Sequence, residues 1–116
     1  MPSGNLFADT TPPAEGERFE TILKHRNLVI ERILSSAAIT PSEYVQEQDE
    51  WVLLAHGEAQ MQVAGKAVLL KAGDYLFLPA GTPHTVTRVS EGAIWLAVHL
   101  HPEQPAPASV ARYGNP

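Results

Sequence analysis

The chain has 116 residues, which is the usual size of one domain, and it contains no cysteine. Disulfides, zinc–thiolate sites and thiol catalysis are therefore excluded, and the lack of cysteine fits a reducing cytoplasm. Thirteen acidic residues against eight basic ones give a formal charge of −5, and the basic residues are scattered. Because nucleic-acid binding needs clustered Lys and Arg, this balance favours a small molecule or another protein as partner.

The two ends of the chain are rich in proline and small polar residues. Residues 1–17 predict a flexible lead-in, and because they contain no apolar stretch we expect neither a signal peptide nor a membrane anchor there. Residues 102–116 contain four prolines and predict a Pro-rich tail. The folded domain is therefore expected over residues 18–101.

Short segments with alternating polarity fill this central part. Residues 19–23 and 28–36 are predicted as strands, because the β-branched content of 29–33 outweighs a helical spacing across 18–34. An alternating pattern over 42–57 predicts the next strand. Further strands are predicted at 59–63, 67–71, 75–79, 84–89 and 93–101, with a hairpin turn at 64–66. Such closely spaced short strands are typical of an all-β sandwich or barrel.

The segment GDYLFLPAGTPH (73–84) leads from a glycine turn through a strand to a loop that ends on His84. Pro79 has a fixed φ, and Gly81 permits a turn conformation that a side chain would obstruct. A neutral imidazole held in one orientation suits a transition-metal ion. The spacing alone leaves open that His84 is an ordinary histidine at the end of a loop.

Four of these residues have the spacing of a known motif. Gly73, Pro79, Gly81 and His84 match the second motif of the cupins, which the chain resembles over residues 28–101. The resemblance implies a cupin-type double-stranded β-helix, that is, a jelly-roll barrel. Arg88 departs from the motif, because asparagine is usual at that position.

The first cupin motif is only half present. Glu50 and Gly57 match its second half, but the two histidines of its first half are absent. The three-residue spacing of the motif places Tyr44 and Gln46 there and is preferred to the four-residue spacing, which would give Glu43 and Val45. The chain is thus similar to small single-domain bacterial cupins with a Tyr-x-Gln-x3-Glu-Trp segment. The resemblance identifies a scaffold more than a reaction, because most such proteins have no assigned chemistry.

The candidate metal ligands are His84, Glu50, Gln46 and His99. Glu50 shares the parity of inward-facing residues, although the acidic cluster around it could also be a solvated face. Gln46 offers an amide oxygen, which is a weak ligand. For His99 three roles stay open: a nitrogen ligand, a residue that orients the ligands by hydrogen bonding, or a hydrogen-bonded core histidine. The mixed nitrogen and oxygen donors suit a divalent transition metal, with Fe, Mn, Ni, Zn and Cu unresolved.

Four further residues are expected to line the pocket: Tyr44, Met61, Arg88 and His101. Arg88 has the parity of His84, so it is expected to bind a substrate carboxylate or to pair with Glu50, and that pairing would weaken the metal hypothesis. His101, near the end of the last strand, is expected at the surface or at the rim of the pocket. The rest of the lining is expected to be mostly apolar.

Two functions of different classes follow. The first is a small metal-binding cupin with an apolar barrel pocket, with or without enzymatic activity on a small organic acid or carbonyl compound. The second is a metal-free module that binds or senses a small molecule without catalysis, favoured by the loss of the two motif histidines. A purely structural β domain ranks below both. We further expect a cytoplasmic homodimer with a small-molecule ligand and no nucleic-acid or membrane partner.

Overall fold

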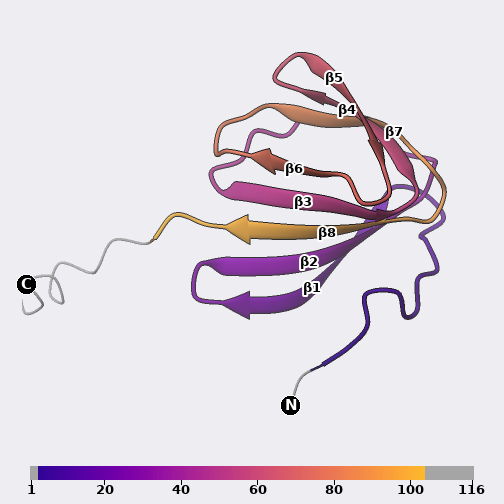
Figure 1. Cartoon of the computed structure of the whole chain (residues 1–116), viewed down its shortest axis with the longest axis horizontal. Coiled ribbons are helices and arrows are strands. Elements are labelled where there is room, and N and C mark those ends of the chain that lie inside the picture. Colours follow the sequence, from indigo (N-terminus) through magenta and orange to yellow (C-terminus); the bar gives the residue numbers. More distant parts are fainter. Residues whose placement is uncertain (1–2, 104–116) are drawn as a thin grey trace, which may run out of the picture.

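Two antiparallel sheets face each other in the computed structural model, which describes residues 3–103 (Figure 1). The larger sheet has the order β1 (Glu17–His25), β2 (Leu28–Ser35), β8 (Ala93–Leu100), β3 (Asp49–His56), β6 (Tyr75–Leu78). The smaller sheet has the order β5 (Lys66–Lys71), β4 (Glu58–Val63), β7 (His84–Val89). The predicted all-β fold is confirmed. Within residues 3–103 there is no helix long and apolar enough to cross a membrane.

The hairpin between β4 and β5 follows from its two turn residues. Ala64 and Gly65 have φ angles of 48° and 81°, so both central positions of the turn are left-handed. Such a two-residue turn matches the right-handed twist of the flanking strands, and Gly65 adopts it without steric cost. The turn fixes the register in which Val63 pairs with Lys66.

The core lies between the two sheets and is built from alternate residues of each strand. Buried apolar side chains of the larger sheet meet those of the smaller one in a single cluster, which includes Ile33, Val52, Leu54, Met61, Leu70, Leu78, Val89 and Trp95. Because successive side chains of a strand point to opposite faces, each buried residue of β3 and β4 is flanked by more exposed neighbours. Burying one large apolar side chain stabilises the fold by about 2 kcal/mol, and the sum of these contributions holds the two sheets together.

The strand predicted over residues 42–57 is shorter in the structure, where residues 36–48 form a loop. Only the half from Asp49 onward is a strand, and the preceding residues form a loop that touches the barrel at Tyr44. Tyr44 pairs with His84 in an isolated bridge through two main-chain hydrogen bonds of 2.8 and 3.0 Å. The Gln46 carbonyl also accepts a hydrogen bond of 2.8 Å from Gly81. The loop is therefore attached beside the site instead of continuing β3.

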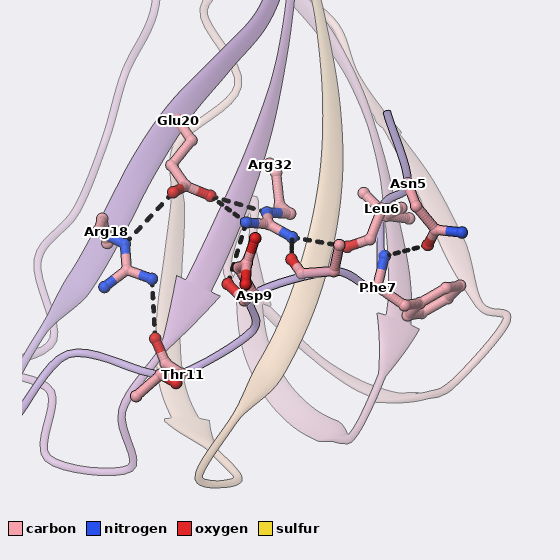
Figure 2. A network of polar contacts seen from close by, with 9 residues as sticks. Asn5, Leu6, Phe7, Asp9, Thr11, Arg18, Glu20 and Arg32 are labelled. Carbon is pink, nitrogen blue, oxygen red and sulfur yellow. Dashed lines mark hydrogen bonds and ion pairs between the residues drawn. The ribbon is translucent and has the colours of Figure 1, made fainter. Parts of the chain in front are cut away.

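The N-terminal segment lies on the outer face of β1 and β2 (Figure 2). Arg32 donates hydrogen bonds to Glu20 at 2.7 Å and to the carbonyl groups of Leu6, Ala8 and Asp9. Arg18 donates to the Thr11 carbonyl at 2.8 Å. The described part of the predicted lead-in is thus fastened to the sheet, and β1 begins at Glu17. Of the predicted tail, residues 104–116 lie outside the described residues.

The outer face of the larger sheet is apolar beyond this segment. Phe77, Trp51 and Val98 form one cross-strand row, and Tyr75, Leu53 and Leu96 form the next. Tyr75 and Phe77 are 65% and 60% exposed, and the rings of Trp51 and Tyr75 lie 5.6 Å apart. We call these six residues the outer patch.

Candidate functional site

A cavity of about 90 Å³ lies between the two sheets and contains most of the predicted site residues. Tyr44, Gln46, Glu50, Met61, His84 and His99 all line it. The other lining residues are Glu17, Phe19, Glu31, Ile33, Val52, Leu78, Val86 and Trp95. Half of the lining residues are therefore apolar, and the charged and polar ones come from β1, β2, β3, β7 and β8 and from the loop before β3.

His84 is held by the loop that precedes it. Thr82 donates a main-chain hydrogen bond of 3.0 Å to Pro79, and Gly81 lies between them with a φ of 82°. This is the type II turn, in which glycine is favoured at the third position because φ is positive. The His84 Nδ1 atom lies 2.9 Å from the Thr82 carbonyl oxygen, which can only accept a hydrogen bond. Nδ1 is therefore the protonated nitrogen, and in the neutral ring Nε2 has a free lone pair.

This lone pair faces a carboxylate. The Nε2 atom of His84 lies 3.8 Å from Oε1 of Glu50, and both side chains are only 8% exposed. Burial raises the pKa of Glu50 above its ordinary value; nearby His99 and His84 lower it, Glu31 raises it further, and a hydrogen bond from Gln46 lowers it. The structure thus brings the predicted pair of Glu50 and His84 together at a position largely shielded from solvent.

His99 lies beside this pair on the neighbouring strand, where it is the cross-strand partner of Glu50. Its Nε2 atom lies 2.9 Å from Oε1 of Glu31, and its Nδ1 atom lies 3.3 Å from the amide nitrogen of Gln48. With Glu31 as a carboxylate, Nε2 donates and Nδ1 accepts, so both ring nitrogens are used. In this arrangement His99 is a buried, hydrogen-bonded histidine and has no lone pair left for a metal ion.

Tyr44 and Gln46 reach the cavity from the loop and not from β3. The Tyr44 ring stacks on the His84 ring with centroids 6.0 Å apart and is itself 48% exposed. The Gln46 side chain hydrogen-bonds Glu50. Both residues therefore contact the His84–Glu50 pair, although neither offers a strong metal ligand.

Arg88 is not brought to the cavity. The pairing of β7 with β4 shifts at one point, where Gln60 faces Arg88 but Met61 faces Val86. Thr87 is thus the extra residue of a β-bulge, and a one-residue shift exchanges the two faces of a strand. Arg88 consequently points outward and is exposed, so the parity that placed it with His84 holds only as far as Val86. Arg88 neither pairs with Glu50 nor lines the cavity.

His101 also lies outside the cavity lining. It follows the last residue of β8 and exchanges hydrogen bonds with Asn27, whose side-chain amide donates to its carbonyl at 2.9 Å. Its ring lies 6.2 Å from that of His99, toward the surface. His101 was expected at the surface or at the rim of the pocket, and the structure places it beside the site, on its outer side.

Two carboxylates of the cavity were missed by the sequence analysis. Glu31 lies on β2 with the parity of Val29 and Ile33, and a charge between these two apolar residues was the signal that could have identified it. Glu17 begins β1 and accepts a hydrogen bond of 3.0 Å from Ser35, while burial raises its pKa. Ser35 also accepts a hydrogen bond from the buried Trp95 indole.

Within residues 3–103 no three His, Cys, Asp or Glu side chains are arranged as the ligands of one metal ion. The two free donors that face each other are Nε2 of His84 and Oε1 of Glu50. A third strong donor would have to come from His99, and that requires the release of Glu31.

Comparison with known proteins places this barrel in a family. The sequence profile described as the cupin domain matches residues 30–104. A crystal structure from Ralstonia eutropha, which carries the provisional description of a mannose-6-phosphate isomerase, is 34% identical and has a TM-score of 0.76. The alignment covers 86% of this chain and 98% of that one. No curated protein matches the chain.

More distant structures share the fold. An RmlC-like cupin from Shewanella frigidimarina is 18% identical, with a TM-score of 0.70 over 84% of this chain and 90% of that one. KdgF from a Halomonas species is 13% identical, with a TM-score of 0.68 over 76% of this chain and 82% of that one. The profile match and the Ralstonia relative, together with the jelly-roll architecture, show that this chain belongs to the cupin family.

Proposed function

We propose that this cupin binds one divalent transition-metal ion between His84 and Glu50, at the polar end of a cavity that admits a small molecule. The observation that carries the proposal is that a lone pair of the His84 ring and the Glu50 carboxylate face each other. The Thr82 carbonyl holds the hydrogen of His84 on Nδ1, so the bare Nε2 atom faces the buried carboxylate of Glu50 at 3.8 Å. Two acceptors at this distance repel each other unless a cation or a proton lies between them.

The residues present fit a metal ion in part. Bonds from a transition metal to imidazole and to carboxylate are each about 2.0–2.2 Å long, so one ion can contact both groups across 3.8 Å. A metal-bound histidine commonly donates its other N–H to a carbonyl group, as His84 does to Thr82. Gln46 could add a weak amide oxygen, and His99 could add a nitrogen only by releasing Glu31.

Such an ion would supply Lewis acidity and leave positions open for a small ligand. The protein's own part is to keep water out and to fix the donors. Val52, Met61 and Leu78 are 4%, 3% and 2% exposed and form a dry wall beside the pair. Tyr44 covers the other side of the His84 ring.

A metal-free binding pocket is the second candidate, and a specific observation favours it. Both ring nitrogens of His99 are engaged, so within the described residues only His84 and Glu50 bring free strong donors face to face at this site. Affinity for a transition metal falls when strong ligands are lost. In that case a proton on Glu50, whose pKa burial raises, would remove the repulsion that the ion otherwise relieves.

Elemental analysis of protein purified without added metal distinguishes the two candidates. We expect close to one equivalent of metal in the wild type, and a loss of affinity of more than about 100-fold in His84→Ala and in Glu50→Gln, since each removes a ligand outright. His25→Ala removes an exposed histidine of β1 and serves as the matched control that keeps its metal. Less than about a tenth of an equivalent, without recovery when metal is added, would contradict metal binding and favour the second candidate.

A further inference from the structure

The cavity is lined by acidic groups but by no basic side chain except its histidines. Glu17, Glu31 and Glu50 all line it, while none of the lining residues is Lys or Arg. Glu31 is compensated by the hydrogen bond to His99 at 2.9 Å. Glu17 has only the Ser35 hydroxyl as its hydrogen-bond donor among the described residues, and Glu50 is 6% exposed. The cavity therefore carries an excess of negative charge that a ligand can neutralise.

The arginines nearest in sequence are all turned away from the cavity. Arg18 and Arg32 are neighbours of cavity residues on β1 and β2, but they lie on the outer face, where they bind Glu20 and the N-terminal segment (Figure 2). Arg88 is turned outward by the bulge in β7. A carboxylate or phosphate ligand would need such cations, since burial of an unpaired anion is costly.

Two aromatic rings are left open where the cavity meets solvent. Phe19 is the cross-strand partner of the buried Ile33, and both line the cavity, yet Phe19 is 54% exposed. Tyr44 lines it from the loop and is 48% exposed. Exposed aromatic rings next to carboxylates are the surroundings in which proteins bind organic cations, because the ring face attracts positive charge.

The size of the cavity limits the ligand. A volume of about 90 Å³ favours a small group in the enclosed part of the cavity. The acidic lining does not favour a phosphate ester, so the description of the Ralstonia relative does not transfer to this cavity.

We propose that the cavity, when it holds no metal ion, binds a small organic cation, such as an alkylammonium or amidinium group, and rejects carboxylates and phosphates. The cation would lie between the carboxylates of Glu17 and Glu50, against Phe19 and Tyr44. The proposal rests on the metal-free candidate above, because Glu50 cannot hold a metal ion and the organic cation at once, and it replaces the small organic acid expected from the sequence.

Three probes of nearly equal shape test the proposal: acetamidinium, acetamide and acetate, titrated at equal ionic strength. The protein is first treated with a chelator, because a bound metal would itself attract acetate. The two tryptophan indoles provide the readout by NMR, since Trp95 lines the cavity and Trp51 lies in the outer patch. We expect the Trp95 signal to shift with acetamidinium at a Kd at least about tenfold below that for acetate, with acetamide between them.

Glu17→Gln should weaken acetamidinium binding by about three- to tenfold and leave acetamide binding unchanged, because the amide still accepts from Ser35. Glu15→Gln removes the same charge from an exposed position two residues away and should change neither affinity. Acetate binding as tight as acetamidinium binding, or no saturable shift of Trp95 with any probe, would overturn the proposal. A wild-type protein that binds no metal but still prefers acetamidinium to acetate would instead contradict only the metal site.

Discussion

His84 and Glu50 show how single hydrogen bonds decide the chemistry of the site. The Thr82 carbonyl fixes the tautomer of His84, so a lone pair and not an N–H faces the Glu50 carboxylate. Glu31 does the opposite to His99, because it holds a hydrogen on the Nε2 atom. Two histidines in one cavity are thereby given different roles: His84 is free to accept a cation or proton, and His99 is not.

Glu17 allows a test of buried charge away from the proposed metal ligands. Burial raises its pKa above the ordinary value of 4.5, so the folded protein binds this proton more tightly than the unfolded chain does. The contribution of Glu17 to stability should therefore decrease as the pH rises from 4.5 through the raised pKa. We expect Glu17→Gln to be more stable than the wild type at pH 7 and to depend less on pH.

Urea unfolding of metal-free protein at several pH values between 4.5 and 8 measures this effect. Glu15→Gln, with the same loss of charge at an exposed position, should follow the wild-type curve. A Glu17→Gln curve parallel to that of the wild type would show that the carboxyl group titrates alike in the folded and unfolded states.

Among the elements, the turn before β7 and the bulge within it aim the side chains of the site. The type II turn delivers His84 inward, and the bulge at Thr87 then exchanges the two faces of the strand. Val86 and Val89 both pack toward the core although they are three residues apart, and Arg88 points to solvent. The strand thus contributes an imidazole to the cavity and keeps its guanidinium outside.

Gly81→Ala tests the turn. A Cβ atom at this position meets nothing within 4 Å, so the only cost is the positive φ of 82°. We expect a loss of about 1–2 kcal/mol in unfolding free energy, which corresponds to a Tm roughly 4–16 °C lower, and weaker metal binding because His84 is displaced. Gly4→Ala, also in open space but without a positive φ, should leave the Tm and the metal content unchanged. An unaltered Tm in Gly81→Ala would mean that the turn is not what orients His84.

The molecule as a whole presents two different faces of its larger sheet. The inner face holds the cavity, and the outer face holds the N-terminal segment and the outer patch. The patch combines the side chains of Tyr75 and Phe77, which are 65% and 60% exposed, with four partly buried apolar side chains. Exposed apolar patches of several hundred Å² commonly mark interaction sites, and a standard interface needs about 800 Å² from each partner.

We therefore predict that a second copy of the chain covers the outer patch, with a polar rim supplying the rest of the interface. Light scattering should give twice the chain mass of 12.6 kDa for the wild type. Phe77→Glu should weaken dimerisation by at least about 30-fold, since central aromatic residues contribute most to such interfaces. Leu69→Glu places the same charge at a 77% exposed position of β5 and should remain dimeric. A wild type that is monomeric at high concentration would contradict the prediction.

Much of the site could be anticipated because it depends on local order. His84 and Glu50 were identified from motif spacing and strand parity, and both face the cavity. Arg88 was misplaced because parity changes at a bulge, and a bulge depends on how β7 pairs with β4, two segments distant in sequence. Glu31 was overlooked because its role comes from His99, which is 68 residues away along the chain.

The sequence by itself determined the all-β architecture, the cupin scaffold and the histidine-bearing loop, because alternation, turn residues and local φ preferences act over a few residues. Only the tertiary structure decided which polar groups meet. The tautomer of His99, the outward turn of Arg88, and the attachment of Tyr44 and Gln46 from a loop each depend on contacts between segments distant in sequence. The tautomer of His84 is set locally by Thr82, but the carboxylate that its lone pair faces comes from another strand. These contacts set the charge of the cavity, and with it the ligand that it can bind.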